Sequence, residues 1–313
     1  MRYKRALVTG GAGCIGSHLS DALIRRRIKT YVIDDLSLGR RDNLNPNATF
    51  FRLSVESPKV SALIEKLKPD VVFHMAAQID VRVSVREPIR DARVNVIGGL
   101  RVLEGCVRAK AKRLVFSSSG GAIYHGLKVI PTPENVPSLP RSPYGVSKLA
   151  FELYLHSVCH THGLPYVALR YANVYGPRQG ARGEAGVVSV FARQMLAGKT
   201  PVVYGDGKQS RDFVYVDDVV RANLLAMKPS AHGVFNIATG RETSVNGIVR
   251  LLRRETGYRG KIGSGPEVRG EERRSVLDAS LAKRVLGWEP AVGLEEGLAK
   301  TVAWMRTHLK SQA

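Results

Sequence analysis

The chain has few cysteines, few acidic residues and no long apolar run. Its three cysteines, Cys14, Cys106 and Cys159, form neither a CxxC pair nor an even framework, which excludes a disulfide scaffold and favours a reduced compartment. No apolar stretch approaches the ~18 residues that a membrane-spanning helix needs. The N-terminal residues run directly into a strand pattern without a signal peptide. We therefore expect a cytoplasmic protein with no membrane partner.

Acidic residues are scarce relative to basic ones. The chain has 48 lysines and arginines against 27 aspartates and glutamates, a formal net charge of +21. The basic residues are scattered, and no basic stripe is interleaved with aromatic side chains as in single-strand nucleic-acid platforms. We therefore expect no nucleic-acid partner. A solvated basic surface and a diffuse field that attracts anionic small molecules both remain open.

The first half of the chain alternates short buried strands with amphipathic helices. The expected strands are Arg5–Thr9, Thr30–Asp34, Val71–Met75, Arg113–Ser118 and Tyr166–Arg170. The expected helices are Cys14–Arg26, Ser57–Leu67, Pro88–Ala109 and Tyr144–His162, with a further one near the end of the chain at Leu294–His308. This alternation predicts an α/β fold with a doubly wound parallel sheet of the Rossmann type.

The rhythm loosens after about Gly176, where glycine, arginine and proline collect. We expect a cofactor-binding domain over residues 1–175, with segments around 213–240 returning to it. A smaller mixed α/β portion over 176–313 is expected to bind the substrate.

Four glycines, Gly10, Gly11, Gly13 and Gly16, lie between the first strand and the first helix. They fit G-x-G-x-x-G from Gly11 or G-x-x-G-x-x-G from Gly10. Either spacing lets the backbone approach a pyrophosphate, and the helix N-terminus then offers free N–H groups to the anion. A tight structural turn is the competing interpretation.

Asp34 ends the second strand, where a carboxylate can accept hydrogen bonds from the adenosine ribose and repel a 2′-phosphate. This position favours NAD over NADP, although Arg40 and Arg41 lie close by in the sequence.

Tyr144 and Lys148 lie four residues apart on an expected helix, and therefore on one face. An adjacent ammonium lowers the pKa of a phenol from its usual ~10. The pair can thus act as a general base that takes a proton from a sugar hydroxyl. An amphipathic helix with a solvated lysine would show the same spacing.

Ser117, Ser118 and Ser119 end an expected strand at its carboxyl end, where doubly wound sheets bind their ligands. A hydroxyl there can bond the reacting oxygen. Ser119 is the predicted catalytic hydroxyl, and Ser118 is an alternative.

Taken together, the motifs TGGAGCIGSHL, PDVVFHMAAQ, SSSGGAIY, SPYGVSK, LRYANVYGPRQ and RDFVYVDDVV resemble the extended short-chain dehydrogenases. Within that family they are most similar to the NAD-dependent sugar-nucleotide epimerases of the UDP-glucose 4-epimerase type. The resemblance covers nearly the whole chain and implies Tyr144 as base, Lys148 as its electrostatic partner and Ser119 as the orienting hydroxyl. It also implies a resident NAD, a UDP-hexose substrate inverted at C4 through a 4-keto intermediate, and a homodimer. The group of His156, His160 and His162 lacks a matched carboxylate pattern, so we expect no metal.

The resemblance assigns further contacts by position. The implied NAD contacts are Gly10, Gly13, Cys14, Ile15, Gly16, Asp34, Asp35, Ser37, Gly39, Ser54, Val55, Met75, Ala76, Ala77, Gln78, Asn95, Ser117, Ser118, Tyr144, Lys148 and Tyr171. The implied substrate contacts are Ser119, Asn173, Val188, Tyr204, Arg211 and Arg269. Arg269 lies one residue later than the family's usual arginine, a slot that Val268 fills here.

The residues after Ser119 separate the family's reactions. Related dehydratases and decarboxylases carry acidic residues there, whereas this chain has Gly120, Gly121, Ala122 and Ile123. The sequence therefore predicts epimerisation rather than elimination. Alternatives that stay open are a UDP-N-acetylglucosamine or UDP-glucuronate 4-epimerase, and a non-catalytic NAD-binding regulatory protein.

Overall fold

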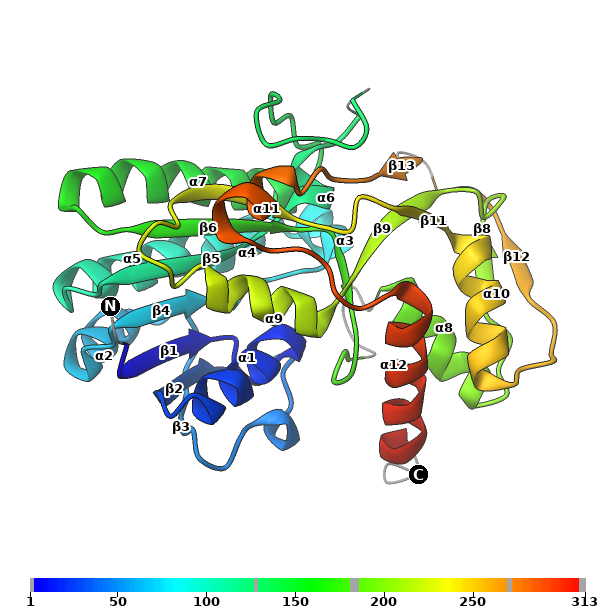
Figure 1. Ribbon diagram of the computed structural model, residues 1–313, viewed down its shortest axis with the longest axis horizontal. Helices are drawn as coiled ribbons and strands as arrows, with labels where there is room; N and C mark the ends of the chain where they lie inside the picture. The colour runs from blue at the N-terminus through cyan, green and yellow to red at the C-terminus, as the bar shows by residue number, and fades with distance from the viewer. Residues whose placement is uncertain (1–2, 127–128, 181–185, 269–271, 310–313) are drawn as a thin grey trace.

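The computed structural model describes residues 3–126, 129–180, 186–268 and 272–309. Its centre is a seven-stranded sheet in the order β10-β6-β5-β4-β1-β2-β3, with every pair parallel (Figure 1). The strands are β1 (Arg5–Thr9), β2 (Lys29–Asp34), β3 (Thr49–Arg52), β4 (Val71–His74), β5 (Arg113–Ser119), β6 (Tyr166–Tyr171) and β10 (Gly233–Ile237).

Helices cover both faces of this sheet. One face carries α1 (Cys14–Arg25), α9 (Val216–Leu225) and α11 (Ser280–Leu286), and the other carries α2 (Lys59–Leu67), α5 (Gly98–Arg108) and α7 (Pro143–His162). Separate apolar clusters fill the two layers, with Trp288 fully buried in the first and Phe151 fully buried in the second. Burial on both faces explains why the strands are apolar throughout. The predicted α/β doubly wound fold is confirmed.

The predicted helix over Pro88–Ala109 is not uniform. It consists of α4 (Pro88–Ala92), a five-residue π-helical turn called η2 (Arg93–Ile97) and α5. A short helix, α3 (Val81–Arg86), precedes it. π-Turns of this kind widen a helix locally and often occur at functional sites. The remaining expected elements differ from those observed by a few residues at their ends.

A second, smaller lobe is built on β9 (Ser210–Tyr215). Its partners are β11 (Glu242–Ser244) on one side and, on the other, β13 (Arg274–Ser275) and β7 (Asn173–Tyr175) in succession. β8 (Val202–Tyr204) pairs with β12 (Gly263–Gly265). The helices of this lobe, α8 (Val187–Leu196), α10 (Val245–Thr256) and α12 (Leu294–Leu309), share a third apolar cluster and lie together in Figure 1.

The division of the chain at residue 175 stays a prediction, although β10 does join the main sheet beside β6. Among the described residues, no helix is long and apolar enough to cross a membrane. Because all seven strands of the main sheet are parallel, their carboxyl ends meet at one edge. That edge carries the glycine loop, Asp34 and the serine cluster.

Candidate active site

The glycine loop is a tight turn that tolerates no side chain at several positions. Gly10 has φ +68°, and a Cβ there would lie 2.6 Å from the amide nitrogen of Ala76. A Cβ at Gly16 would lie 2.2 Å from the carbonyl oxygen of Gly10. Gly13 is different, because its added Cβ would meet only the Gly10 carbonyl, at 3.3 Å. Gly10 and Gly16 therefore shape the turn, whereas Gly13 leaves the open surface of a cradle.

The first turn of α1 faces this cradle without a competing anion. Gly13 is its N-cap, no side chain caps the helix, and its first turn has no acidic residue. The free N–H groups and the positive end of the helix dipole are thus available to a phosphate. The loop and the helix together fit the pyrophosphate of a dinucleotide.

Asp34 closes one side of the cradle at the end of β2. Its carboxylate accepts hydrogen bonds from the backbone N–H groups of Ala12, at 2.9 Å, and Leu36, at 2.8 Å. Burial raises the pKa of Asp34, and these two hydrogen bonds oppose that rise. A carboxylate has about four acceptor positions, so two remain for ribose hydroxyls.

We expect Gly16→Ala to weaken NAD binding at least tenfold, or by about 1.4 kcal/mol. The new methyl group would displace the Gly10 carbonyl and with it the loop that follows β1. Isothermal titration with NAD measures the loss. Gly293→Ala is the matched control, because an added Cβ at Gly293 meets nothing within 4 Å. Equal affinity in the two variants would contradict this role of the loop.

The segment after β4 is fixed by the π-turn. Asn95, in η2, accepts from the Gln78 backbone N–H at 2.9 Å and donates to the Gln78 carbonyl at 3.0 Å. Its amide also donates to the Ser147 hydroxyl at 3.2 Å, and that hydroxyl donates to the Tyr144 carbonyl at 2.9 Å. A single buried side chain thus joins the loop after β4 to the first turn of α7. Asn95 and Gln78, both predicted as cofactor contacts, stand in this network.

Gly98 and Gly99, which follow Asn95, allow close packing. A Cβ at Gly98 would lie 2.8 Å from a methyl group of Val55, and one at Gly99 would lie 2.6 Å from the Phe151 ring. The loop carrying Ser54 and Val55, both predicted as NAD contacts, is thereby held against α5.

Lys148 links α7 to the serine cluster. Its ammonium donates to the Ser117 carbonyl at 2.9 Å, and its side chain is 3% exposed. Because α7 crosses back between parallel β5 and β6, it runs antiparallel to β5. The step back along α7 from Lys148 to Tyr144 therefore points the same way as the step forward along β5 from Ser117 to Ser119. Four helical residues and two strand residues also cover a similar distance, roughly 6 Å. This places Tyr144 and Ser119 at the same level of the sheet edge.

Ser118 points toward α7, the helix that carries Glu152, and strand alternation turns Ser117 and Ser119 to the other side of β5. Its hydroxyl donates to Glu152, which is also bound by Arg170 through Nε at 3.0 Å and Nη2 at 2.6 Å. Arg170 Nη1 donates to the Tyr124 hydroxyl. Of the two candidate serines, Ser118 is therefore engaged by Glu152, and Ser119 remains the candidate hydroxyl at the edge.

Sequence reasoning missed Glu152, Arg170 and Tyr124 as parts of this network. The signal for Glu152 is its spacing: Tyr144, Lys148 and Glu152 follow at intervals of four residues along one face of α7. No local pattern pointed to Arg170 in β6, because its partner comes from a different element.

A second set of polar residues faces the sheet edge from β9 and its neighbours. Ser275 pairs with Arg211, and Asn173 pairs with Phe213, so these side chains share one face of the small sheet. A Cβ added to Gly121 would lie 3.8 Å from both Asn173 Oδ1 and Ser275 Oγ. Ser275 is thus a candidate substrate contact that the sequence did not reveal.

The other predicted substrate contacts differ in their settings. Val188, in α8, is 1% exposed and packs in the apolar cluster of the smaller lobe. Tyr204, in β8, is 48% exposed. Arg211 donates to its neighbour's carbonyl, that of Ser210, at 2.9 Å. Arg269 lies outside the described residues.

The remaining predicted cofactor contacts lie around the same edge. Met75 and Ala76 are held by Thr9, through its carbonyl at 3.1 Å and its hydroxyl at 3.2 Å. Tyr171, at the end of β6, is buried, and its hydroxyl accepts from Asn223 Nδ2 at 2.8 Å. Of the other predicted cofactor contacts, Cys14 and Ile15 lie in the first turn of α1, and Asp35, Ser37, Gly39 and Ala77 lie on loops.

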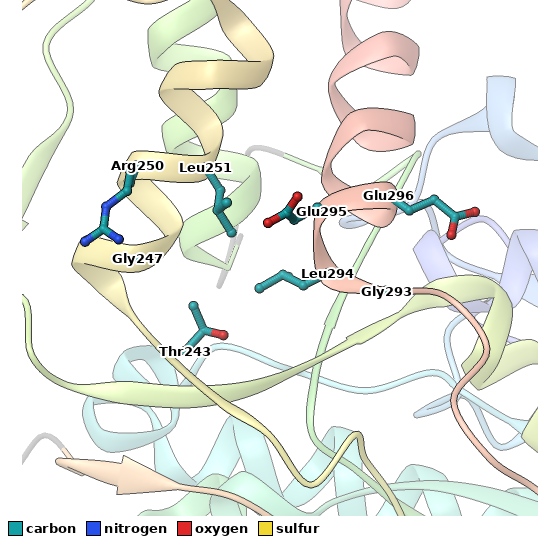
Figure 2. A pocket seen from close by; sticks show the side chains of 8 residues that line it. All are labelled: Thr243, Gly247, Arg250, Leu251, Gly293, Leu294, Glu295 and Glu296. Atoms are coloured by element: carbon teal, nitrogen blue, oxygen red, sulfur yellow. The ribbon is translucent and has the colours of Figure 1, made fainter.

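Two hollows lie away from the glycine cradle. One, of about 550 Å³, lies between the first turns of α10 and α12, where Figure 2 shows Arg250 and Glu295 on facing helices. None of the predicted site residues lines it. The other, of about 450 Å³, lies between α4 and α7 and is lined in part by Asp91, Arg141 and Ser147.

The doubly wound sheet and its phosphate cradle define a dinucleotide-binding α/β protein. Comparison with known proteins narrows this class. A model of the NAD dependent epimerase/dehydratase family matches residues 6–238. The chain belongs to this family, and its cofactor is NAD.

Three solved structures are similar over nearly the full length. A UDP-glucose 4-epimerase from Thermotoga maritima with UDP-glucose is 50% identical, with a TM-score of 0.95, covering 97% of this chain and 99% of that one. A UDP-glucose 4-epimerase from Thermus thermophilus with NAD is 40% identical, with a TM-score of 0.92 and coverage of 96% and 99%. A UDP-N-acetylglucosamine 4-epimerase from Methanobrevibacter ruminantium is 36% identical, with a TM-score of 0.93 and coverage of 98% and 100%.

Proposed function

We propose that this protein is a UDP-sugar 4-epimerase that interconverts UDP-glucose and UDP-galactose. The observation that carries the proposal is the buried Lys148 ammonium, which donates to the Ser117 carbonyl and lies 5.7 Å from the Tyr144 ring, beside a sheet whose first loop fits NAD. The likeness to UDP-glucose 4-epimerases at 40–50% identity supports the UDP-hexose substrate.

Tyr144 takes the proton from the C4 hydroxyl, and Ser119 donates a hydrogen bond to the same oxygen as it becomes a carbonyl. When bound, NAD would supply the hydride acceptor for C4 and, as NADH, the hydride donor for the return step. Lys148 supplies the positive charge that stabilises the Tyr144 phenolate. After the 4-keto sugar has turned over and presents its opposite face to the hydride, Tyr144 gives the proton back to the C4 oxygen. The reaction needs no external oxidant or reductant.

The loop after Ser119 favours epimerisation over elimination. Removal of water across C5–C6 needs an acid and a base beside the catalytic hydroxyl. The short helix α6 (Gly120–Ile123) contains only glycine, alanine and isoleucine, and Gly120 packs against Leu277. No carboxylate comes from α6 itself.

The diphosphate of the substrate is proposed to bind near Arg211 and Asn173. A guanidinium is well suited to a diphosphate because it offers several fixed N–H donors. Arg269 is proposed to add a second contact to the diphosphate, because Val268 fills the position of the family's usual arginine.

Gly121 and Ser275 leave space where the sugar is proposed to lie. We expect Gly121→Val to raise KM by about tenfold or more through steric exclusion, without a change in Tm. Gly121→Ala is the matched control, since its Cβ makes only ordinary contacts of 3.8 Å. Steady-state kinetics and thermal melts of both variants test this. If the valine variant has the same KM as the wild type, the sugar does not bind beside Gly121.

UDP-N-acetylglucosamine is a second candidate substrate, supported by the likeness to an epimerase of that sugar at 36% identity. Proton NMR of purified protein with UDP-galactose, UDP-N-acetylglucosamine or UDP-glucuronate distinguishes the three. We expect UDP-glucose to form from UDP-galactose until a constant ratio is reached. Conversion of another sugar alone would replace the proposed substrate, and no conversion of any would favour a non-catalytic NAD-binding protein.

A homodimer is also proposed. Exposed apolar side chains gather on neighbouring helices of one side: Val85 of α3, Ile89 of α4, and Val146, Leu153 and Tyr154 of α7. A second copy that presents the same helices would bury these side chains in a self-complementary interface. Sedimentation equilibrium tests this, and a monomer mass at micromolar concentration would contradict it.

A further inference from the structure

Lys148 is a buried cation among two buried carboxylates. Burial lowers its pKa to about 8, and the negative charges of Asp91 and Glu152 oppose this fall. Its only hydrogen-bond acceptor among the described contacts is the neutral Ser117 carbonyl. The charge state of Lys148 near neutral pH therefore depends on how strongly each of these two carboxylates stabilises its ammonium form.

The charge of Glu152 is largely cancelled. Both of its oxygens are bound by the Arg170 guanidinium, in a pair whose side chains are 5% and 7% exposed. Opposite charges at hydrogen-bond distance form a dipole, whose field falls off faster than that of a single ion. Glu152 thus contributes little net charge at the distance of Lys148.

Asp91 has no such partner among the described residues. It is 1% exposed, and its Oδ1 accepts from Gln78 Nε2 at 2.8 Å and Asn95 Nδ2 at 3.0 Å. Both donors are neutral amides. Its Oδ2 is buried and has no hydrogen-bond partner. The Asp91 carboxylate is therefore buried without a cationic partner among the described residues.

Other titratable groups around Lys148 do not replace this charge. His74, in β4, stacks on Phe116 and stays neutral, because burial lowers its pKa to about 3. Arg141, which lines the hollow shared with Asp91, is exposed and therefore screened by water. Tyr144 is the remaining ionisable group on this face of α7, and its ring lies 5.7 Å from the Lys148 ammonium.

We propose that Asp91 is a positioning residue that acts through Lys148: its uncompensated buried charge keeps Lys148 an ammonium at the pH of catalysis. The hydrogen bonds from Asn95 to Asp91 and to Ser147 hold the same carboxylate in register with the turn that carries Tyr144. This inference rests on the proposed function, because the ammonium matters only if Tyr144 must form a phenolate.

The test is the titration of Lys148 in Asp91→Asn. The asparagine keeps the shape of the side chain and an oxygen for both amide donors, but removes the charge. With lysines labelled at ¹³Cε, the Lys148 resonance is the one that is absent in Lys148→Met. We expect its pKa to fall by roughly one to three units relative to the wild type. Glu65→Gln, which neutralises a carboxylate of a half-exposed side chain, is the control and should leave the pKa unchanged.

Activity gives a second readout. Loss of the ammonium above its pKa should end activity, so the alkaline limb of kcat against pH should move to lower pH in Asp91→Asn and return towards that of the wild type in Asp91→Glu. Asp91→Ser serves the same purpose if the asparagine variant does not fold. An unchanged Lys148 pKa in a folded, uncharged variant overturns the proposal. The NMR titration needs no substrate. A protein inactive on UDP-sugars would therefore contradict the proposed function, whereas the effect of Asp91 on the pKa of Lys148 could still be measured.

Discussion

Replacing Tyr144 with phenylalanine is expected to slow 4-epimerisation by a factor of about 10²–10⁴. The substitution removes one oxygen, the atom that takes the proton from the C4 hydroxyl, and leaves the ring in place. Because the ring and the first turn of α7 are retained, UDP-sugar binding and thermal stability should change little. The Ser147 contact to the Tyr144 carbonyl, at 2.9 Å, does not involve the hydroxyl and should persist.

Proton NMR of the turnover of UDP-galactose measures this loss, and ligand titration measures the retained binding. Thr161→Ala, at an exposed position near the end of the same helix, is the control and should keep its activity. A Tyr144→Phe variant with more than a tenth of wild-type activity would exclude Tyr144 as the base.

Replacing Arg170 with methionine is expected to have the largest effect on stability. The variant leaves Glu152 charged, buried and unpaired, which costs about 3–5 kcal/mol of unfolding free energy. The Tyr124 hydroxyl and the Ser118 hydroxyl depend on the same pair, so the loop after β5 should loosen and kcat should fall as well.

Urea unfolding measures the free energy. Arg108→Met, which breaks a surface pair with Glu104 whose side chains are both about half exposed, is the control and should cost about 0–1 kcal/mol. The double variant Arg170→Met, Glu152→Met should be more stable than Arg170→Met alone, because it removes the stranded charge. Equal stability of the single variant and the Arg108 control would contradict the role of the buried pair.

Most of the main sheet could be predicted because its central strands are buried on both faces. The β1, β2, β4, β5 and β6 sequences are short apolar runs, and such runs are typical of parallel strands. β3 was missed because Thr49 and Arg52 are exposed at the edge of the sheet. β10 was not distinguished because it follows a loosely patterned region and begins with a glycine of φ +95°.

The site could be predicted only as far as local spacing reaches. Glycine spacing, the carboxylate ending β2 and the Tyr144–Lys148 interval are all local patterns. The choice between Ser118 and Ser119 depends on where Glu152 lies, and that follows from the packing of α7 on β5. The π-turn at Asn95 accompanies hydrogen bonds to Gln78, a residue on another segment, which a helical periodicity cannot reveal.

The central claim is that a hydride leaves C4 of the sugar and returns to the same carbon. It is tested most directly with UDP-galactose carrying deuterium at C4, incubated with the purified protein in ordinary water. The account predicts UDP-glucose that keeps the deuterium at C4, since the hydride never exchanges with solvent. UDP-glucose with hydrogen from water at C4 would contradict it, because inversion would then proceed by proton abstraction from carbon.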